Sequence, residues 1–521
     1  MTSPRYPAYL FLLLSFLEGG AVMAAELIGA KMLAPFFGSS LYVWSTVLAV
    51  TLGGLAAGYF TGGWLSSKRG TPKTLFICLA VAGMFMAAMP VTSKFIMYRI
   101  GFYELIPATI FSSLVFLFPP VFTMGTVSPL IIGNLATDPA QSGKYSGLVY
   151  GISTIGGIGA TFLTGFWVIP QFGLSVPTFI IGGLLAAVPT VLLFREYKWF
   201  PLVVILFFGA CIFRYTSRKP SSANITIKYH KEGLLGQLTV ADFPVGDSTG
   251  KHPPQTERYL TVNRVWQSQF NLDTNNTAIP EYDYLMEMFR ATSAQPPHAR
   301  VLTLGLGGGN FQNQLCDSGY HVDACELDPR MEEIARTYFR LRKNVNVVID
   351  DARHYLRMNR KPYNAVFYDI FKGEHPPEHC FTLEAFREVR NNMMPNAVFA
   401  INLWGYYSGE RGRGVRSIFA TLASAGFNAF TYATGPDENQ SNLVLLAFRT
   451  DCDPALVAET KSRLKGIPVD LGPLLADAPI QTDEKPALDH LNMQAYRDFR
   501  HLYVAYYYTL RRYQQEPPVF Y

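Results

Sequence analysis

The first 213 residues are a series of long apolar runs separated by short polar loops. A helix needs roughly 20 apolar residues to cross a bilayer, and its backbone polar groups must bond to one another there because lipid offers no partners. We therefore expect residues 1–213 to form an α-helical membrane bundle of about seven spans. The expected spans are 9–29, 41–65, 74–93, 105–135, 145–170, 174–194 and 199–213. The fourth contains Pro119-Pro120, which predicts a kink or a re-entrant segment, and the seventh is short.

Small residues recur in the second and fifth expected spans at spacings that let two helix backbones approach closely. They are Gly53, Gly54, Ala57, Gly58 and Gly62 in the second span, and Gly151, Gly156, Gly157 and Gly159 in the fifth. This pattern is typical of a tightly packed bundle. A transport pathway is the alternative interpretation.

Two acids, Glu18 and Glu26, lie two helical turns apart in the first span, and therefore on one face of that helix. A carboxylate inside a membrane is costly, so it marks a candidate functional group. Lys31 lies close to Glu26 in the sequence and offers an interfacial ion pair instead. Both interpretations of Glu26 stay open.

The composition narrows the classes of function. Charged residues make up 16% of the chain, below the ~25% of a typical protein, and the shortage lies in the apolar first part. The net charge of +5 is mild and forms no basic stripe, so we expect no nucleic-acid partner. The six cysteines include no CxxC pair and no metal-ligand spacing, so we expect buried thiols and no metal site. The first apolar run has no small-residue cleavage site, which favours a retained anchor over a signal peptide.

Residues from 214 onward have the composition of a soluble protein. We expect a polar linker at 214–224, a small β-rich segment with a helix at 225–295, a catalytic domain at 296–495 and a tail at 496–521. The expected strands are 225–229, 234–241, 258–262, 301–304, 320–325, 345–349, 363–368, 398–403 and 442–448, and the expected helices are 281–289, 311–316, 329–339, 354–358, 383–391 and 414–426. Strands that alternate with helices predict a doubly wound, Rossmann-like α/β sheet, which binds ligands outside the carboxyl ends of its strands.

A glycine-rich turn separates an apolar strand from a short helix near the start of the expected catalytic domain. Its glycines Gly305, Gly307 and Gly309 let the backbone approach a ligand closely, and the N–H groups at the start of the following helix favour an anionic or polar guest. Glu326 ends the next strand and is placed to accept hydrogen bonds from both hydroxyls of a ribose. The glycine-rich turn and Glu326 together therefore predict a nucleoside-binding site.

Two further residues indicate which nucleoside is bound. Asn310 stands where the dinucleotide fingerprint GxGxxG requires its third glycine. Asp351 ends the third strand of this region and is placed to bind the exocyclic amine of an adenine. A glycine turn, a ribose acid and an adenine acid on three successive strands favour an adenosyl-sulfonium ligand over NAD.

These motifs resemble those of the spermidine synthase family, the polyamine aminopropyltransferases, over roughly 225–495. The matching elements are Gly307-Gly308-Gly309-Asn310, Cys325-Glu326-Leu327-Asp328, Asp351-Ala352, NRVWQ from Asn263 to Gln267, and YNAVFYD at 363–369. IQTDEKPALDHL at 480–491 resembles the closing motif of membrane-fused members. The stretches 37–63 and 150–173 in the apolar part also resemble fused bacterial members.

The resemblance implies roles for individual residues. Asp369 would be the catalytic base, and Gln267 and Tyr284 would position the acceptor. The residues implied to hold the donor are Gly305, Gly307, Gly309, Asn310, Glu326, Asp351 and Ala352.

The chain departs from the family around the acceptor. The family follows its catalytic aspartate with SSDP, whereas this chain continues with Ile370-Phe371-Lys372 and so places a cation where a second acid is usual. The EF-x-YHE element keeps Glu281 and Tyr284 but loses its histidine and second glutamate. Because a diamine needs carboxylates to replace its hydration, these changes weaken the prediction of putrescine as acceptor, although Glu374 offers partial compensation.

The resemblance implies a membrane-anchored aminopropyltransferase that takes decarboxylated S-adenosylmethionine as co-substrate, holds no tightly bound cofactor and acts on an amine or polyamine. S-adenosylmethionine-dependent methyl transfer is one alternative, and a non-catalytic adenosyl or polyamine sensor coupled to a transport bundle is another. Basic residues are nearly equal in number on the two sides of the bundle, so they do not orient it. Because the donor is made inside cells, we expect a multi-pass protein of the inner membrane with residues 214–521 in the cytoplasm. A homodimer is left open.

Overall fold

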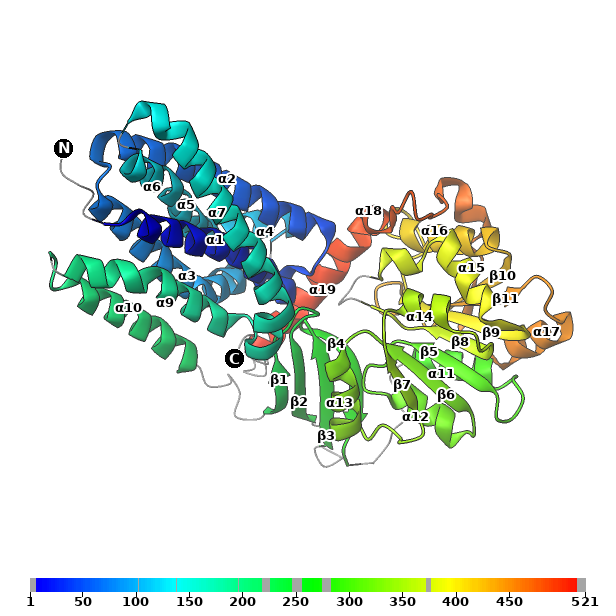
Figure 1. Cartoon of the computed structure of the whole chain (residues 1–521). Helices are drawn as coiled ribbons and strands as arrows, with labels where there is room; N and C mark the ends of the chain where they lie inside the picture. Colours follow the sequence, from blue (N-terminus) through cyan, green and yellow to red (C-terminus); the bar gives the residue numbers. More distant parts are fainter. Residues whose placement is uncertain are drawn as a thin grey trace. The chain divides into compact units, whose positions relative to one another are not determined.

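The structure is a computed structural model that describes residues 6–101, 103–136, 138–194, 196–217, 225–245, 255–273, 283–371 and 376–512. These residues form two compact units, a helical unit and an α/β unit (Figure 1). The helical unit lies within Met1–Ala223, Tyr229–Leu238 and Val504–Tyr521. The α/β unit lies within Asn224–Lys228 and Thr239–Tyr503.

The helical unit consists mainly of long apolar helices. They are α1 Ala8–Phe37, α2 Leu41–Arg69, α3 Pro72–Ile100, α4 Leu105–Phe116, α5 Phe118–Gly125, α6 Val127–Leu135, α7 Ser142–Leu163, α8 Ile169–Phe172, α9 Ser175–Phe194 and α10 Phe200–Thr216, with η1 Pro139–Gln141 and the π-helical turn η2 Thr164–Val168 between them. In the described part of the chain, five helices are long and apolar enough to cross a membrane, and a bent pair makes a sixth if it counts as one span.

Two of the expected spans differ from simple helices. The fourth bends by 50° between α4 and the stretch Phe118–Leu135, beside Pro119-Pro120, as the sequence predicts. The seventh corresponds to α10, which has only 17 residues and is shorter than the helices that meet the length for crossing. The expected total of about seven spans therefore stays a prediction.

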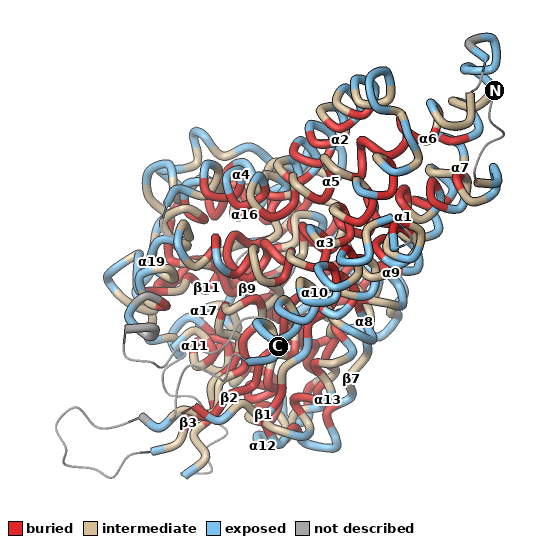
Figure 2. Tube along the Cα trace, turned by 90° about the vertical axis from the view of Figure 1, so that its left-hand side faces the viewer, coloured by how far each residue is buried: buried red, intermediate tan, exposed pale blue. Residues whose placement is uncertain are grey.

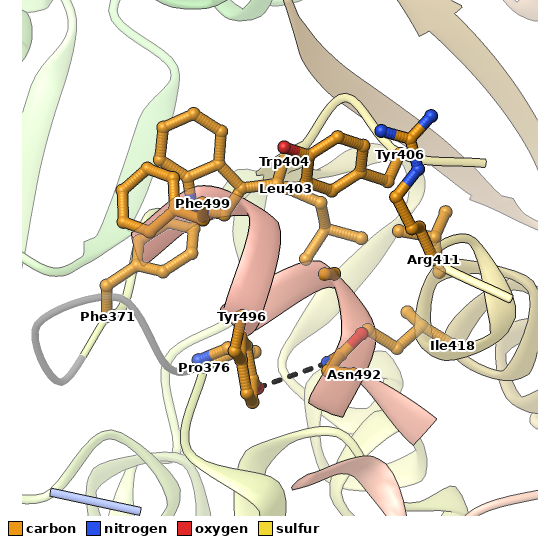
Figure 3. Close-up of a pocket in the computed structure, with 12 residues that line it drawn as sticks. Phe371, Pro376, Leu403, Trp404, Tyr406, Arg411, Ile418, Asn492, Tyr496 and Phe499 are labelled. Atoms are coloured by element: carbon orange, nitrogen blue, oxygen red, sulfur yellow. Dashed lines mark hydrogen bonds between the residues drawn. The ribbon is translucent and has the colours of Figure 1, made fainter. Parts of the chain in front are cut away.

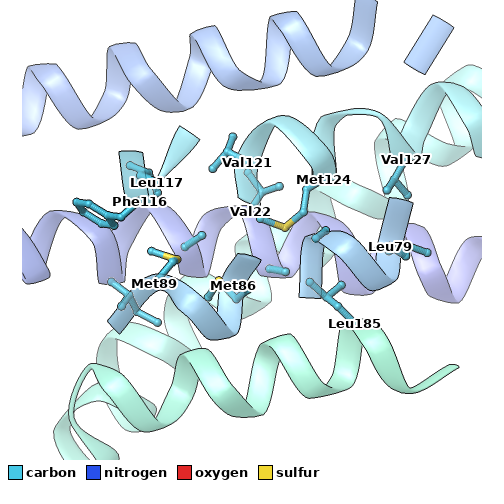
Figure 4. Close-up of a cluster of buried hydrophobic side chains, with 14 of the residues drawn as sticks. Val22, Leu79, Met86, Met89, Phe116, Leu117, Val121, Met124, Val127 and Leu185 are labelled. Carbon is cyan, nitrogen blue, oxygen red and sulfur yellow. The ribbon is translucent and has the colours of Figure 1, made fainter. Parts of the chain in front are cut away.

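The interior of the helical unit is filled by apolar side chains, among them Met86, Met89 and Met124 (Figure 4). At several helix contacts only a glycine leaves enough room, for example at Gly58 and Gly156. A Cβ on Gly58 of α2 would lie 2.4 Å from a carbonyl oxygen of α5, and one on Gly156 of α7 would lie 2.1 Å from a carbonyl oxygen of α1. These contacts confirm the expected close packing at both positions. Three of the other glycines have no neighbouring atom within 4 Å among the described residues, namely Gly53, Gly151 and Gly159.

The acid Glu18 of α1 is buried inside the helical unit. Its carboxylate accepts hydrogen bonds from the hydroxyls of Ser128 on α6, at 3.4 Å, and Ser153 on α7, at 3.2 Å. Glu26, one of the two candidate groups of the first span, is only partly buried. Hydroxyl groups from two other helices thus replace part of the hydration that Glu18 loses on burial.

A four-stranded sheet follows the apolar helices in the chain, with strand order β1-β2-β3-β4. Its strands are β1 Thr226–Lys231, β2 Leu238–Val245, β3 Gln255–Val262 and β4 Val265–Asn271. Gln267 lies within β4, a strand that is absent from the expected set. The turn before it is formed by Asn263 and Arg264, whose φ angles of 50° and 69° suit a two-residue hairpin loop between β3 and β4.

An eight-stranded sheet forms the centre of the α/β unit, in the order β12-β10-β11-β9-β8-β5-β6-β7. Its strands are β5 Arg300–Leu304, β6 His321–Glu326, β7 Asn346–Ile349, β8 Tyr363–Tyr368, β9 Met393–Trp404, β10 Phe427–Ala433, β11 Asn442–Arg449 and β12 Ile467–Val469. The strands β7, β6, β5, β8 and β9 are parallel, whereas β11, β10 and β12 add antiparallel pairs at one edge. The predicted α/β sheet is confirmed, with β5 at the point where the strand order reverses.

Helices connect the strands of this sheet. They are α11 Asp283–Thr292, α12 Asn310–Asp317, α13 Pro329–Tyr338, α14 Ala352–Met358, α15 Leu383–Asn391, α16 Arg413–Ser424, α17 Pro454–Arg463, α18 Leu488–Leu491 and α19 Met493–Arg512, with the 3₁₀ turns η3 Glu378–Cys380 and η4 Gly472–Asp477. Strand β11 is almost entirely buried, as is the 397–403 stretch of β9 (Figure 2), which explains their nearly continuous apolar sequences.

Six of the strands and helices that follow the apolar part are absent from the sequence-based expectation: β4, β10, β12, α17, α18 and α19. Strand β10 mixes exposed, partly buried and buried residues, so its apolar pattern is weak. Residues 496–512, expected as part of a tail, belong to α19.

Candidate active site

The glycine turn after β5 is pinned to both neighbouring strands. The N–H of Gly305 donates to the carbonyl of Cys325 at the end of β6, at 2.8 Å, and Gly305 has a φ of 100° that L side chains rarely adopt. A Cβ on this residue would lie 2.2 Å from the carbonyl oxygen of Asp369, which follows β8. The structure therefore brings the predicted donor turn and the predicted base into direct contact.

The start of helix α12 is held against strand β4. Gly309, at φ 79°, is the N-cap residue of α12, and the N–H of Gly308 donates to the hydroxyl of Ser268 at 2.7 Å. The side-chain amide of Asn310 donates to the carbonyl of Gln269 at 2.9 Å. Asn310, predicted to contact the donor, is thus buried and ties the turn to β4.

Glu326 lies at the end of β6, as predicted, with its carboxylate beside the glycine turn. Its Oε2 accepts from the N–H of Leu306 at 3.1 Å and its Oε1 accepts from the N–H of Asp328 at 2.9 Å. Burial raises the pKa of Glu326 above its usual value, and these backbone hydrogen bonds offset part of the shift. A carboxylate offers about four lone-pair positions, so the backbone contacts do not use all of them and a ligand hydroxyl can still be accepted.

Asp351 caps helix α14, which begins at Ala352. Its Oδ1 accepts from the N–H groups of Arg353 and His354, and its Oδ2 lies 2.9 Å from Nε2 of His379. Partial burial raises the pKa of Asp351, but the hydrogen bonds from His354, His379 and Arg353 outweigh it and hold the pKa below its usual value. Asp351 is therefore ionised, and only Oδ2 is clear of the helix cap.

Arg353 connects this acid to the segment that resembles a closing motif. Its guanidinium forms ion pairs with Asp483 at 2.6 Å and Glu388 at 3.0 Å, and it donates to the carbonyl of His379 at 2.9 Å. The hydroxyl of Thr382 also donates to Asp483, at 2.7 Å. Because the same guanidinium holds Asp483 and the His379 backbone, it fixes the position of the ring that contacts Asp351.

Asp369 is held by two side chains from other elements. Nδ2 of Asn402, on β9, donates to its Oδ1 at 2.9 Å, and the hydroxyl of Tyr284, on α11, lies 3.4 Å from its Oδ2. Asn402 is itself oriented by Asn442 of β11, whose Nδ2 donates to its Oδ1 at 2.8 Å. Burial raises the pKa of Asp369, and the hydrogen bonds from Asn402 and Tyr284 offset part of that rise. Such a carboxylate is suited to accept a proton at a pH nearer neutrality.

The predicted acceptor residues are only partly described. Tyr284 reaches Asp369, as described above, and Gln267 lies on β4 next to Ser268, which supports the glycine turn. Glu281 and Lys372 lie outside the described residues, as does Glu374.

Sequence reasoning missed four residues of this site, namely Ser268, His379, Asn402 and Asn442. The amide of Asn402 interrupts the apolar run AVFAINLW, and a polar group in a buried strand needs a partner. That signal marks Asn402 as a residue with a specific contact. Nothing local marks the other three, because their partners are distant in the sequence.

Parts of the chain are similar in sequence to known transferases. No family model matches the chain. It is 32% identical over 114 residues to a polyamine aminopropyltransferase from Vibrio vulnificus, which aligns 20% of this chain with 38% of that protein. It is also 30% identical over 132 residues to an N-terminal histidine N-methyltransferase from Emericella nidulans, which aligns 24% of each. The chain thus spans less than half the length of either relative.

Among solved structures, a probable spermidine synthase from Corynebacterium glutamicum aligns with 51% of this chain and 97% of its own, with 17% identity and a TM-score of 0.39. Both curated relatives carry the names of transferases, and one of them is an aminopropyltransferase. This chain is a spermidine synthase-like protein.

Proposed function

We propose that the chain is a membrane-anchored aminopropyltransferase that moves the aminopropyl group of decarboxylated S-adenosylmethionine to an amine. The observation that carries the proposal is the position of Asp369. Its carboxylate is held by Asn402 and Tyr284, and its backbone touches the glycine turn at Gly305. A base and a nucleoside cradle in direct contact are the two parts that this transfer requires.

The proposed reaction starts with a protonated amine at Asp369. The carboxylate takes one proton, and the neutral nitrogen then attacks the carbon attached to the sulfonium sulfur. A nitrogen–carbon bond forms while the carbon–sulfur bond breaks, and its electron pair passes to sulfur to give neutral methylthioadenosine. A base with a raised pKa suits this proton transfer at neutral pH, and an in-line arrangement lowers the entropic part of the barrier.

The donor would lie over the turn that contains Gly305, Gly307 and Gly309. Glu326 would accept from the ribose hydroxyls with the lone pairs that its backbone contacts leave open. Asp351 would accept from the adenine amine through Oδ2, since Oδ1 caps helix α14. His379 competes for that oxygen, so adenine binding would require the histidine ring to share it or to move.

Product analysis tests this function. Full-length protein in detergent is incubated with decarboxylated S-adenosylmethionine and a mixture of amines, and the nucleoside products are separated by chromatography. We expect methylthioadenosine to form with a matching amount of aminopropylated amine. Asp369→Asn should lower turnover by roughly 10²–10⁴-fold while donor binding is retained. Unchanged turnover in this variant would rule out Asp369 as the base.

Methyl transfer is a second candidate, favoured by the similarity to a histidine N-methyltransferase. It uses the same nucleoside residues and differs in the donor, which keeps its carboxylate. The same incubation with S-adenosylmethionine separates the two, because methyl transfer yields S-adenosylhomocysteine rather than methylthioadenosine. Donor binding without either product would support the sensor interpretation instead.

The five long apolar helices support a membrane location for the proposed enzyme. We place the α/β unit in the cytoplasm because an adenosyl-sulfonium donor is made inside cells. Fusion of the carboxyl terminus to a reporter that works only outside the cytoplasm tests this orientation. Reporter activity would contradict both the orientation and the donor.

A further inference from the structure

Glu18 lies well inside the first apolar helix of the helical unit. It follows Ala8, where α1 begins, by ten residues, or about 15 Å at 1.5 Å per residue. The residue is only 2% exposed. Val22, one turn further along α1, belongs to the apolar cluster that fills the unit (Figure 4). The carboxyl group of Glu18 therefore lies among apolar packing, away from the helix end.

Side chains from three helices meet at this carboxyl group. The hydroxyls of Ser128 on α6 and Ser153 on α7 both donate to the same oxygen of Glu18, Oε2, at 3.4 and 3.2 Å. Ser128 lies in the first turn of α6, after the interruption at Thr126 that separates α6 from α5. An acid inside a membrane bundle is expensive and is by default a functional group. The two long contacts from neutral hydroxyls do not explain why an acid stands here.

The described helices supply no counter-ion for Glu18. The helices α4, α5, α6 and α9 carry no charged side chain. The titratable groups on which the charge of Glu18 acts are the phenols of Tyr59 on α2 and Tyr150 on α7, whose rings pack with centroids 6.0 Å apart. The cations of α1, α2, α3 and α7 form no ion pair with Glu18; they are Lys31, Lys68, Arg69, Lys73, Lys94, Arg99 and Lys144. An ionised Glu18 would thus be a buried charge without a partner of opposite sign.

Helices α1 and α7 pack closely beside this acid. A Cβ on Gly19, the neighbour of Glu18, would lie 2.0 Å from the carbonyl oxygen of Ser153. The hydroxyl of Ser15, one turn earlier on α1, donates to the carbonyl of Val149 on α7 at 2.9 Å. A hydration shell around the carboxyl group would therefore require α7 to move away from α1.

We propose that Glu18 is a proton-binding site of the helical unit, and that release of its proton is coupled to separation of α7 from α1. A neutral carboxyl group keeps Oε2 as an acceptor for both hydroxyls, so the observed contacts suit the protonated form. After release the proton passes to the entering water, and the carboxylate regains the hydration that two hydroxyls do not replace. A proton, unlike Na⁺ or an ammonium group, needs no cavity beside the acid. The inference is independent of the transferase reaction.

Infrared spectroscopy of full-length protein in lipid vesicles tests the site. The carbonyl stretch of a protonated carboxyl group should be present at neutral pH, disappear at alkaline pH and be missing from Glu18→Gln at every pH. Glu26→Gln is the matched control, since Glu26 lies on the same helix and is only partly buried. That variant should keep the band that Glu18→Gln loses. If Glu18→Gln keeps every carbonyl band of the wild type, the proposal is overturned.

Hydrogen exchange tests the coupling to helix movement. In the wild type, residues 146–160 of α7 should lose protection roughly tenfold or more as the infrared band disappears, after correction for the intrinsic pH dependence of exchange. Glu18→Gln stays neutral and keeps an acceptor for both hydroxyls, so its protection should not change with pH. An equal loss in Glu18→Gln and the wild type would overturn the coupling. Thermal unfolding checks that both variants are folded.

The choice of a proton over another monovalent cation is tested by the salt present. The pH at which the band disappears should be the same in sodium chloride, methylammonium chloride and N-methylglucamine chloride. The same pH in all three salts supports a proton site. A lower pH in sodium or methylammonium would show that this cation replaces the proton at Glu18, and it would overturn the assignment.

Discussion

The side-chain amide of Asn402 donates a 2.9 Å hydrogen bond to the carboxylate of Asp369, across the neighbouring parallel strands β8 and β9. Asn402 is in turn held at 2.8 Å by Asn442 on the antiparallel strand β11. Three strands of one sheet thus fix the orientation of one carboxylate. The side chains around Asp369 set both its direction and its pKa.

Removal of the Asn402 amide should change the pH dependence of the reaction. In Asn402→Ala the carboxylate loses a donor to its charged form, so the pKa of Asp369 rises further above its usual value. The base must be ionised to act, so we expect the acidic limb of the kcat/KM profile to move to higher pH. At neutral pH kcat/KM should fall roughly tenfold or more.

Tyr284→Phe is the matched comparison for that measurement. Its hydroxyl lies 3.4 Å from the carboxylate, longer than the 2.9 Å contact of Asn402, so its removal should shift the limb in the same direction by less. A profile for Asn402→Ala that coincides with the wild type would contradict the assigned role of the amide.

Gly305 should not tolerate a side chain. Its φ of 100° strains any L residue by about 1–3 kcal/mol, and a Cβ would lie 2.2 Å from the carbonyl oxygen of Asp369. We expect Gly305→Ala to lower the melting temperature, weaken donor binding and abolish turnover. Gly319→Ala is the control, because Gly319 has a φ of 89° but its Cβ would meet no atom closer than 4.0 Å. If Gly305→Ala and Gly319→Ala lose melting temperature, donor binding and turnover equally, backbone strain alone accounts for the effect.

The ion pair between Asp483 and Arg353 should make stability depend on acid pH. The hydrogen bond from Arg353 holds the pKa of Asp483 below its usual value, so the pair stabilises the fold above the unfolded-state pKa. That stability is lost as pH falls through the folded-state pKa. Asp483→Asn should cost about 1–2 kcal/mol at neutral pH, less than a fully buried pair because Asp483 is partly exposed.

Urea unfolding at several pH values checks this expectation. The difference in the free energy of unfolding between wild type and Asp483→Asn should shrink toward low pH. There Asp483 becomes protonated and is neutral, as the asparagine of the variant is at every pH. Asp451→Asn is the comparison, since Asp451 pairs with Arg449 at an exposed position and should change stability little. A difference that stays constant with pH would exclude the ion pair as its source.

Glu232 should make part of the helical unit sensitive to pH. It is buried, and its carboxylate accepts from the N–H of Leu174 at 2.6 Å and of Ser175 at 3.2 Å, at the start of α9. Burial raises the pKa of Glu232 to about 7, although these N–H groups and Lys94 oppose the shift. Because the folded-state pKa of Glu232 is raised, its contribution to stability is fully present below its usual pKa. That contribution is lost as pH rises to about 7.

Hydrogen exchange tests this behaviour at residues 229–238. Protection there should fall as pH rises from about 4.5 to about 7, after correction for the intrinsic pH dependence of exchange. Glu232→Gln keeps an acceptor for the two N–H groups and should abolish the change. If Glu232→Gln loses as much protection with rising pH as the wild type does, the effect belongs to another group.

Much of the fold follows from local sequence patterns. The apolar runs of the first part and the alternation of strands with helices depend on neighbours within a few residues, so periodicity is enough to predict them. Strand β10 does not follow because its exposed and partly buried residues weaken the apolar pattern, and helix α19 does not follow because it packs on residues that are distant in the sequence (Figure 3). Strand β4 does not follow either, because the hairpin loop that precedes it, Asn263-Arg264, carries neither glycine nor proline to mark the strand boundary.

The sequence by itself determined the donor side of the candidate site: the glycines after β5, Glu326 and Asp351 stand at strand ends that adjacent residues define. Only the tertiary structure decided which groups meet them. Asn402 reaches Asp369 because β9 pairs with β8, and Phe499 reaches Trp404 because α19 packs at the end of β9. Strand order and helix placement are set by burial of the whole sheet, and no local pattern specifies them.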